Sequence, residues 1–384
     1  MSNKKVIKPG ATIGILGGGQ LGRMMALAGR ASGYRFATLD PTEDCPCAQV
    51  CDKHVEAGYD NVDGALELVQ ASDVITYEFE NVDANVAAVL EEKSYVPQGS
   101  ELLRITQNRI REKSTLSSYG IPVAPFLVIE SEADAESAVK ELGLPAVMKT
   151  ATGGYDGKGQ YVIRKLEEAA VAYRELAKAG TEIIIEQFIP FTVEISVIAA
   201  RSVSGEIKTF PVAENVHREN ILHLSIVPAR IGQAIAERAE ELAGTIAEKL
   251  QVVGLIAVEM FVTEDGHVLV NELAPRPHNS GHYTMDACVT SQFEQHIRAI
   301  CDLPLGETEL LSPVVMVNVL GEHLVPVLDK IEKLPPSAKL HLYGKKDSKP
   351  KRKMGHINVL AGSVEAALSK IEQLQIWEQM KEDM

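Results

Sequence analysis

Two glutamates, Glu259 and Glu272, lie on either side of a predicted turn at residues 265–266, where the sequence reads Asp-Gly. Asp-Gly between two apolar runs is a strong signal for a two-residue β-hairpin turn. With that turn, Glu259 lies directly opposite Glu272, on the side of the hairpin shared by Phe261 and Val270. Opposed side chains in a hairpin lie about 4.5–5.5 Å apart, so two carboxylates there repel each other.

A Mg²⁺ ion between the two carboxylates would remove this repulsion. Magnesium prefers oxygen ligands and is commonly held by one or two carboxylates, and Asn271 offers a further oxygen beside Glu272. Two alternatives need no metal: one glutamate is protonated, or a β-bulge separates the pair. We interpret Glu259 and Glu272 as a magnesium site.

Residues 153–160 read GGYDGKGQ, with four glycines in eight positions. The segment is not a Walker A loop, because Thr152 stands where that motif requires glycine and Gly159 where it requires serine or threonine. It joins two strand-like runs, VMKT and QYVI, so we predict the tip of a hairpin. A glycine-rich flap of this kind can close over phosphates with its amides and Lys158, and exclude water. An ordinary flexible hairpin is the alternative.

GGGQLG, residues 17–22, follows a strand-like run and precedes a helical pattern, and Asp40 ends the next strand-like run. This is the context of the dinucleotide-binding fingerprint. Bare amides at a helix N-terminus also bind a single phosphate, and glycines allow a strand and a helix to pack closely. The motif alone leaves these three interpretations open.

ELAPRPHNSGH, residues 272–282, follows the predicted hairpin directly. Its two prolines predict turns, so we expect Arg276, His278 and His282 to lie outside the core. An arginine just beyond a metal carboxylate can hold a planar anion by two hydrogen bonds. A solvated loop is the alternative.

A basic stretch, GKKDSKPKRKMGH, covers residues 344–356 of a chain with a formal net charge of −15. A run of this kind is usually a solvated surface. A pocket for a phosphate monoester is the alternative, and the run itself does not decide between them.

The acidic balance disfavours non-specific binding to nucleic acid or to anionic membranes. No run of 18 apolar residues could span a bilayer, and the first residues lack the apolar segment of a signal peptide, so we expect a cytoplasmic protein. Among the five cysteines, Cys45, Cys47 and Cys51 lie near His54. Their spacing matches no common zinc motif, and we expect reduced thiols.

The elements that must position these residues fall into three predicted domains. Residues 1–100 alternate strands and helices, which predicts a doubly wound α/β domain with a parallel sheet covered on both faces. Residues 101–310 follow an α+β pattern that ends after the glutamate hairpin, and residues 311–384 predict a small C-terminal module. Helices are predicted over residues 83–93, 107–119, 166–179 and 230–250.

Together the motifs resemble the ATP-grasp superfamily and, at closer range, the family of N5-carboxyaminoimidazole ribonucleotide synthetases. The resemblance covers nearly the whole chain and is carried by GILGGGQLGRM, DVITYEFENV, GGYDGKGQ, EQFI, NELAPRPHNSGH, and LYGK followed by KRKMGH. It implies an N-terminal Rossmann-like domain, a central ATP-grasp domain and a small C-terminal module. It also implies ATP- and bicarbonate-dependent carboxylation of the exocyclic amine of 5-aminoimidazole ribonucleotide, through carboxyphosphate, in de novo purine biosynthesis.

The resemblance implies a role for each matching residue. The ATP-binding set is Arg109, Lys149, Gly154, Tyr155, Asp156, Gly157, Lys158, Gly159, Gln160, Glu186, Gln187, Phe188, Ile189, Glu194, His217, Asn271 and Glu272. The ribonucleotide-binding set is Gln20, Leu21, Glu80, Asn279, Lys345, Arg352 and Lys353. The catalytic set is Arg276, Lys149, Tyr155, Asp156 and Lys158, and the metal set is Glu259 and Glu272. On this interpretation GGGQLG is an anion loop for the ribonucleotide, and the basic stretch is a pocket.

The implied ligands are ATP as co-substrate, bicarbonate, 5-aminoimidazole ribonucleotide and Mg²⁺, and the family leads us to expect a homodimer. Three other functions remain possible at this point. A formate-dependent glycinamide ribonucleotide transformylase is similar in fold but has a serine-rich flap. A nicotinamide-dependent oxidoreductase is supported only by GGGQLG and Asp40. A non-catalytic ATP-sensing module would bind ATP and release no phosphate.

Overall fold

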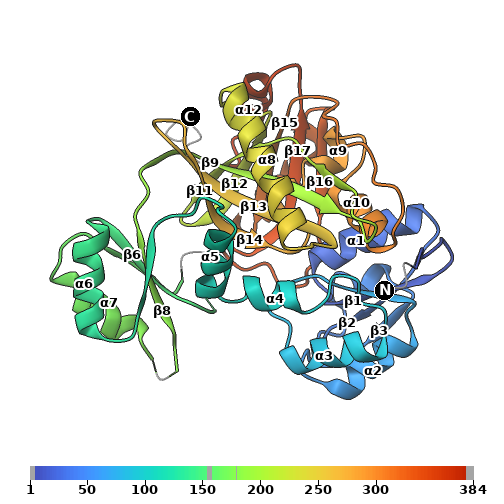
Figure 1. The fold of residues 1–384 in the computed structure, drawn as a ribbon. Helices are drawn as coiled ribbons and strands as arrows, with labels where there is room; N and C mark the ends of the chain where they lie inside the picture. The colour runs from blue at the N-terminus through green and yellow to red at the C-terminus, as the bar shows by residue number, and fades with distance from the viewer. Residues whose placement is uncertain (1–4, 154–157, 179, 378–384) are drawn as a thin grey trace.

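The structure, a computed structural model, describes residues 5–153, 158–178 and 180–377 (Figure 1). These residues form two four-stranded sheets and one nine-stranded sheet. None of the helices in these ranges is both long and apolar enough to cross a membrane.

The N-terminal sheet is parallel and lies between helices (Figure 1). Its elements are β1 (Thr12–Leu16), α1 (Gln20–Ala31), β2 (Arg35–Leu39), η1 (Ala48–Val50), β3 (Lys53–Val55), α2 (Val62–Gln70), β4 (Val74–Tyr77) and α3 (Ala84–Lys93). The strand order is β3-β2-β1-β4, and the strands are mostly buried, as expected for a sheet covered on both sides. α1 packs on one face through Met24 and Met25, and α2 and α3 pack on the other through Leu68 and Leu90. The predicted doubly wound parallel sheet is confirmed.

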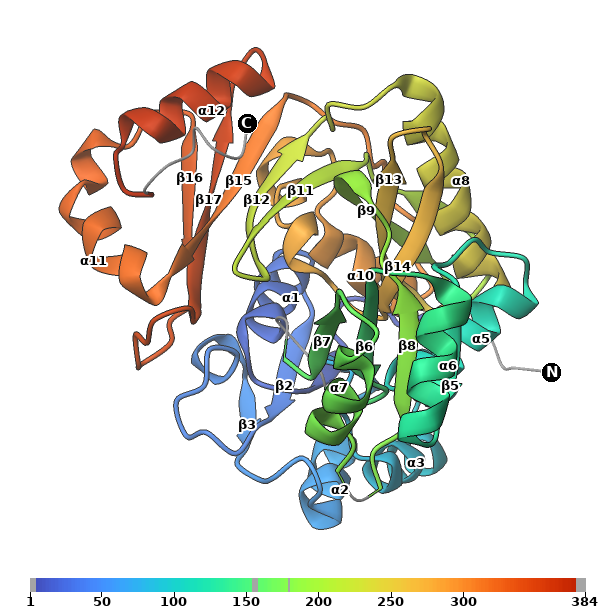
Figure 2. The same cartoon turned by 90° about the vertical axis from the view of Figure 1, so that its left-hand side faces the viewer.

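The second sheet is antiparallel and is covered by two helices (Figure 2). Its elements are β5 (Phe126–Ile129), α6 (Glu132–Leu142), β6 (Ala146–Thr150), β7 (Gln160–Ile163), α7 (Glu168–Leu176) and β8 (Ile183–Gln187). The strand order is β5-β8-β6-β7. β6 pairs with β7, with Lys149 opposite Gln160, so the predicted hairpin is confirmed. Residues 154–157 of its tip lie outside the described residues.

The third sheet is the largest and runs to the C-terminal part of the chain. Its elements and the helices beside it are β9 (Phe191–Arg201), β10 (Ile207–Thr209), β11 (Ala213–Arg218), β12 (Ile221–Val227), α8 (Gln233–Lys249), β13 (Gly254–Thr263), β14 (Val268–Ala274), η2 (Asn279–Gly281), α9 (Thr284–Ala287), α10 (Gln292–Ile300), β15 (Val314–Leu320), α11 (Gly321–Asp329), η3 (Ile331–Lys333), β16 (Ala338–Leu342), β17 (Lys353–Leu360) and α12 (Val364–Gln373). The strand order is β14-β13-β9-β11-β12-β15-β17-β16, with β10 paired to β9. The strands of residues 311–384 therefore continue the central sheet.

Helices cover both faces of this sheet because side chains alternate along β9. Val197 packs with Leu242 of α8 on one face, and Ile198 packs with Ala299 of α10 on the other. α10 also contacts α1, so it lies between the central sheet and the N-terminal unit. α12 packs beside β15 and β17 (Figure 2).

Two short helices, α4 (Glu101–Thr106) and α5 (Arg109–Ser118), join the N-terminal unit to the rest of the chain. Asn108 caps α5, because its Oδ1 accepts hydrogen bonds from the amides of Ile110 and Arg111. Asparagine is among the best N-cap residues. α5 packs against β14 and so brings Arg109 beside the glutamate hairpin.

Gly321, the first residue of α11, packs directly against the basic stretch. A Cβ atom at this position would lie 1.9 Å from the backbone oxygen of Lys349. The hydroxyl of Ser348 donates to the Gly321 carbonyl at 3.0 Å, so the two backbones are held together. Only glycine permits this approach without movement of the backbone.

We therefore expect Gly321→Ala to destabilise the fold by about 1–3 kcal/mol, as overpacking commonly does. The measurement is the free energy of unfolding in denaturant. Gly362→Ala is the matched control, because a Cβ there meets nothing within 4 Å. Equal stability of the two variants would contradict this account of Gly321.

Candidate active site

A cavity of about 610 Å³ lies among the three units, and most of the predicted site residues line it. Those on its wall are Glu80, Arg109, Lys149, Lys158, Gln160, Glu186, Gln187, Phe188, Ile189, Glu194, His217, Glu259, Asn271, Glu272, Arg276, Asn279 and Lys353. Predicted residues away from its wall are Gln20, Leu21, Gly159, Lys345 and Arg352. Gly154, Tyr155, Asp156 and Gly157 lie outside the described residues.

The glutamate hairpin is formed by β13 and β14. Glu259 pairs with Glu272, as predicted. The predicted two-residue turn is wrong, because the amide of Thr263 donates to the His267 carbonyl at 3.0 Å and three residues lie between them. Gly266, with φ of 80°, supplies the left-handed conformation that such a three-residue turn needs.

A bulge in β14 restores the predicted pairing. Met260 pairs with Val270, whereas the preceding residue, Glu259, pairs with Glu272, so Asn271 is the extra residue. Neighbours in a regular strand point to opposite faces, and a bulge re-aims a side chain. Asn271 and Glu272 therefore both line the cavity. Val270, which we expected on the same side, is buried in the core instead.

Glu259 and Glu272 fit a magnesium ion. Burial, and then the charge of Glu272, raises the pKa of Glu259 to about 7. His278 Nε2 lies 3.1 Å from Glu259 Oε1, but burial holds the pKa of His278 well below its usual value, so it supplies no positive charge. No group of three or more His, Cys, Asp or Glu side chains in the described ranges could hold a metal ion. Magnesium held by two carboxylates takes its remaining ligands from phosphates and water.

Arg109 adjoins this pair at the N-terminus of α5. Its Nη1 lies 3.1 Å from Glu272 Oε2, and its side chain is 21% exposed. The cation predicted to hold ATP phosphates is thus in contact with a predicted metal ligand. Phosphates bound by Arg109 would lie within reach of the metal.

A second cation site lies on β6 and β8. Lys149 Nζ donates to Glu186 Oε2 at 2.9 Å. The same oxygen lies 3.5 Å from Nζ of Lys113, a residue of α5 that we did not predict. Burial raises the pKa of Glu186, but the charges of Lys149 and Lys113 outweigh this effect and hold that pKa below its usual value. Lys113 stands four residues after Arg109 on a predicted helix, and this same-face spacing is the signal that could have found it.

Glu112, also on α5, is a further buried group that we did not predict. Its Oε2 accepts a hydrogen bond from the amide of Leu273 at 3.3 Å. Burial, and then the charge of Glu272, raises the pKa of Glu112 to about 8. Glu112 therefore holds the backbone of β14 through this hydrogen bond and adds little negative charge to the site.

The predicted adenine and ribose contacts lie along β8, β9 and β11. The amides of Gln187 and Phe188 donate to the carbonyls of Pro125 and Pro145, at 2.9 and 3.2 Å. These two amides are therefore already satisfied within the protein. Their carbonyl oxygens and the neighbouring residues are what this segment offers a nucleotide.

Glu194 and His217, both on the cavity wall, form an ion pair. Burial lowers the pKa of His217, but the hydrogen bond to Glu194 outweighs this effect and raises that pKa above its usual value. Phe191 and Phe261 stack beside this pair with ring centroids 4.6 Å apart. The wall thus combines an apolar surface with one polar pair, as small-molecule sites commonly do.

Arg276 forms a two-point ion pair with Glu80. Its Nε and Nη2 donate to the two carboxylate oxygens, the second at 3.1 Å. Nη1 donates to the Pro277 carbonyl at 3.2 Å. The pair connects the loop after β4 with the loop after β14, so it joins the N-terminal unit to the central sheet. Glu80 occupies the edge of the guanidinium formed by Nε and Nη2, so an anion would bind Arg276 through the second N–H of Nη1 and of Nη2.

The basic stretch reaches the cavity at one residue, Lys353. Lys345 Nζ donates to the Lys353 carbonyl at 2.8 Å, and burial, then the charge of Arg352, lowers the pKa of Lys345 to about 8. Arg352 donates to the Asp347 carbonyl at 2.9 Å. The charges of Arg352 and Lys353 both act on Lys345, so the three cations lie near one another, with Lys353 on the cavity wall.

Three backbone amides of the GGGQLG loop already donate to carboxylates of the protein. The amides of Gly19 and Leu21 donate to the carboxylate of Glu78, at 3.1 Å for Leu21, and the Gly18 amide donates to Asp40 at 2.9 Å. Burial raises the pKa of Glu78 to about 7. The anion-loop interpretation thus fails for these three amides, because protein carboxylates already occupy them.

One further expectation is corrected, and one agrees with the structure. His282 is core: it is 1% exposed, its ring lies 4.7 Å from that of His356, and its Nδ1 is 3.0 Å from Gln292 Nε2. Burial is tolerated because Gln292 satisfies its polar atom. The cysteines at 45–51 are free, as expected, with the Sγ atoms of Cys47 and Cys51 3.3 Å apart.

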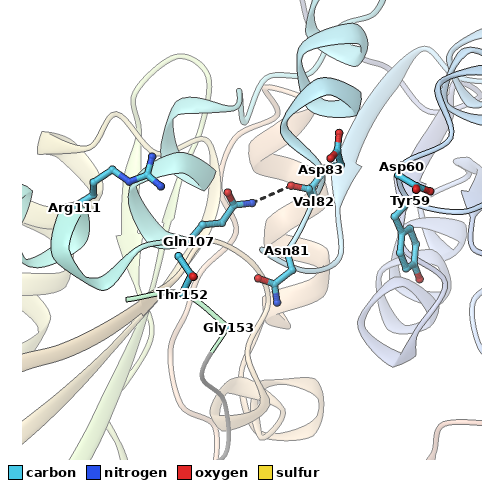
Figure 3. Close-up of a pocket in the computed structure, with 9 residues that line it drawn as sticks. All are labelled: Tyr59, Asp60, Asn81, Val82, Asp83, Gln107, Arg111, Thr152 and Gly153. Carbon is cyan, nitrogen blue, oxygen red and sulfur yellow. Dashed lines mark hydrogen bonds between the residues drawn. The ribbon is translucent and has the colours of Figure 1, made fainter. Parts of the chain in front are cut away.

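A second hollow, of about 620 Å³, lies next to the cavity (Figure 3). Asn81, Gln107 and Gly153 line both. The side-chain Nε2 of Gln107 donates to the Val82 carbonyl at 3.0 Å, as Figure 3 shows. This hollow opens beside the base of the glycine-rich hairpin.

Three family models match the chain. They describe a ribonucleotide synthetase preATP-grasp domain over residues 10–107, an ATP-grasp domain over residues 114–293 and a phosphoribosylaminoimidazole carboxylase C-terminal domain over residues 314–370.

Relatives match over almost the full length. The chain is 53% identical over 361 residues to an N5-carboxyaminoimidazole ribonucleotide synthase of Bacillus subtilis (strain 168), covering 93% of each protein. A crystal structure of the ADP complex of an N5-carboxyaminoimidazole ribonucleotide synthetase has a TM-score of 0.94 and 55% identity, covering 98% of this chain and 99% of that chain. An Aspergillus clavatus N5-carboxyaminoimidazole synthase in complex with ADP and 5-aminoimidazole ribonucleotide has a TM-score of 0.88 and 31% identity, covering 95% of this chain and 97% of that chain.

The raised pKa of Glu259 predicts a pH-dependent stability in metal-free protein. The folded state holds this proton up to about pH 7 and the unfolded state only to its ordinary value of 4.5, so stability falls as pH rises between these values. Glu259→Gln stays neutral. In chelator we expect this variant to be more stable than the parent at about pH 8, by up to about 3 kcal/mol, and similar to it near about pH 5.

The measurement is denaturant unfolding at both pH values. Glu264→Gln, at an exposed position of the same hairpin, is the matched control and should change little. A Glu259→Gln variant less stable than the parent at both pH values would show that this carboxylate supports the fold.

Proposed function

The chain belongs to the N5-carboxyaminoimidazole ribonucleotide synthase family of ATP-grasp enzymes, and we propose that it uses ATP and bicarbonate to carboxylate 5-aminoimidazole ribonucleotide on its exocyclic amine. The observation that carries this proposal is one cavity that gathers Lys149, Arg109, the glutamate pair and the Arg276–Glu80 pair. Relatives of the same fold bind ADP and 5-aminoimidazole ribonucleotide.

ATP would bind with its phosphates at Arg109 and Lys149. Its base would lie along residues 186–189, and its ribose near Glu194, which can accept hydrogen bonds from hydroxyls. Gly154, Tyr155, Asp156 and Gly157 would cover the phosphates, together with Lys158. Closure of such a flap excludes water and protects a labile intermediate.

Glu259 and Glu272 would hold Mg²⁺, with Asn271 beside them. A bound magnesium ion neutralises charge on the transferred phosphoryl group. The raised pKa of Glu259 supports this assignment, because a cation in this position would relieve the repulsion between the two carboxylates.

Arg276 would hold bicarbonate through donors that Glu80 keeps oriented. An oxygen of bicarbonate attacks the γ-phosphorus, the bond to the β-phosphate oxygen breaks, and ADP leaves with carboxyphosphate formed. Lys149 and Arg109 stabilise the charge that develops on the phosphoryl oxygens. The amine then attacks the carboxyl carbon, loses a proton and displaces phosphate, which gives the carbamate. Tyr155 and Asp156 are our candidates for orienting the amine.

The phosphate of the ribonucleotide would bind at Lys345, Arg352 and Lys353. The lowered pKa of Lys345 supports this proposal, because closely placed cations in a partly buried site are stabilised by an anion. Gln20 would contribute its side chain, since neighbouring amides already bind Glu78. Homodimerisation stays a prediction from the family.

The activity is tested by phosphate release from MgATP. We expect release to rise when 5-aminoimidazole ribonucleotide is added, and to require bicarbonate, because a site that closes only over the ribonucleotide avoids futile hydrolysis. Labelled bicarbonate should enter a product that loses the label quickly in acid, as a carbamate does.

Other outcomes would identify other functions. Stimulation by formate with glycinamide ribonucleotide, and none by bicarbonate with aminoimidazole ribonucleotide, would assign the chain to the transformylases. Reduction of a nicotinamide on addition of substrate would indicate an oxidoreductase. Binding of ATP with no phosphate release under any condition would indicate a sensing module.

The basic pocket is tested by Arg352→Ala combined with Lys353→Ala. We expect the KM for the ribonucleotide to rise by about tenfold or more, because two charge-assisted contacts to its phosphate are lost, and the KM for ATP to change little. The matched control is Lys346→Ala with Lys349→Ala, two exposed lysines of the same stretch. Equal increases in both KM values would place Arg352 and Lys353 at the nucleotide site instead.

A further inference from the structure

Lys113 is a buried cation that does not reach the cavity. Its side chain is 1% exposed, and its Nζ lies 3.5 Å from Glu186 Oε2 and 3.4 Å from the Asn271 carbonyl. An ammonium group without contact to solvent is costly unless it is paired. Its location behind the nucleotide site therefore calls for a reason.

Two lysines share one carboxylate oxygen. Lys149 Nζ lies 2.9 Å from Glu186 Oε2, and its side chain is 13% exposed and lines the cavity. Lys113 approaches the same oxygen from α5, on the side away from the cavity. The three groups together carry one net positive charge. Of the three side chains, that of Lys149 is the most exposed.

We propose that Lys113 is a positioning residue for the ATP site, because it neutralises Glu186 and so leaves the charge of Lys149 to the phosphates. Without Lys113, Lys149 and Glu186 form a neutral pair. Phosphates would then compete with a buried carboxylate for the charge of Lys149. In the low dielectric of a partly buried site, this competition weakens binding much more than it would in water. The inference rests on the proposed ATP site.

Packing alone does not explain a lysine here. A methionine of similar length would fill the same space, and replacement of buried charges by apolar groups is often neutral or stabilising when both partners go. A structural role therefore predicts loss of stability in Lys113→Met and no specific effect on nucleotide. A charge-setting role predicts a loss of MgATP affinity that depends on Glu186.

The experiment measures the Kd for MgATP by calorimetric titration of the full chain. We expect Lys113→Met to weaken MgATP binding by about tenfold, as loss of a nearby buried charge does. The Kd for 5-aminoimidazole ribonucleotide should be unchanged. Lys113→Arg, which keeps the charge, should retain most of the affinity. Lys140→Met, at an exposed lysine of α6, is the matched control and should bind as the parent does.

The decisive variant combines Lys113→Met with Glu186→Gln. In this variant Lys149 is the one charged group of the three, so their net charge is again +1, as in the parent. Because Glu186 is itself part of the proposed ATP site, this variant is compared with Glu186→Gln alone. We expect Lys113→Met to weaken MgATP binding by no more than about threefold in the Glu186→Gln background, against about tenfold in the parent. The double variant also leaves no buried carboxylate with an unbalanced partner, so the comparison stays valid if Lys113→Met by itself folds poorly.

The outcomes separate the two proposals. A parent chain that does not bind MgATP would remove the proposed nucleotide site and this inference with it. Normal binding by the parent together with equal binding by Lys113→Met would overturn the inference alone. An equal loss of about tenfold when Lys113→Met is introduced into Glu186→Gln would also overturn it.

Discussion

The cavity brings Lys and Arg side chains together with Glu side chains, inside a chain whose formal net charge is −15. A nucleotide phosphate is repelled by most of such a surface, so cations must be gathered where it binds. Each paired cation that we describe on the wall is held by a carboxylate from another element, as Arg276 is by Glu80 and Arg109 by Glu272. These pairs keep the cations oriented before any ligand arrives, which is what pre-organised electrostatic stabilisation requires.

The same pairs hold the units of the chain together. Arg276 and Glu80 lie on loops after strands of two different sheets, and Arg109 stands at the start of the helix that leads out of the N-terminal unit. Ligand binding and the packing of the units are therefore coupled, because a ligand that binds Arg276 contacts a residue whose ion pair with Glu80 joins two units. α10, which packs between α1 and the central sheet, gives this contact a rigid base.

The central sheet supplies the geometry that the pairs cannot. The bulge at Asn271 turns two neighbouring side chains toward the cavity, and the continuation of the sheet through β15 and β17 places Lys353 on the same wall. A basic stretch that is nearly the end of the chain thereby reaches a site built mainly from residues far before it. The approach of that stretch to Gly321 fixes its path over α11.

The sequence by itself determined the features that depend on neighbours along the chain. The hairpin around the glycine-rich segment and the parallel N-terminal sheet follow from strand alternation and turn residues, and the order of the motifs identified the family. The pairing of Glu259 with Glu272 was predicted from a two-residue turn, but a longer turn and a bulge produce it. Only the tertiary structure decided which polar groups satisfy one another. That Glu78 occupies the GGGQLG amides, that Lys113 shares Glu186 with Lys149, and that a bulge compensates a longer turn depend on how helices and strands pack across long sequence separations. Local patterns carry no information on such contacts, because a buried polar group takes whichever partner the packing brings within hydrogen-bond distance.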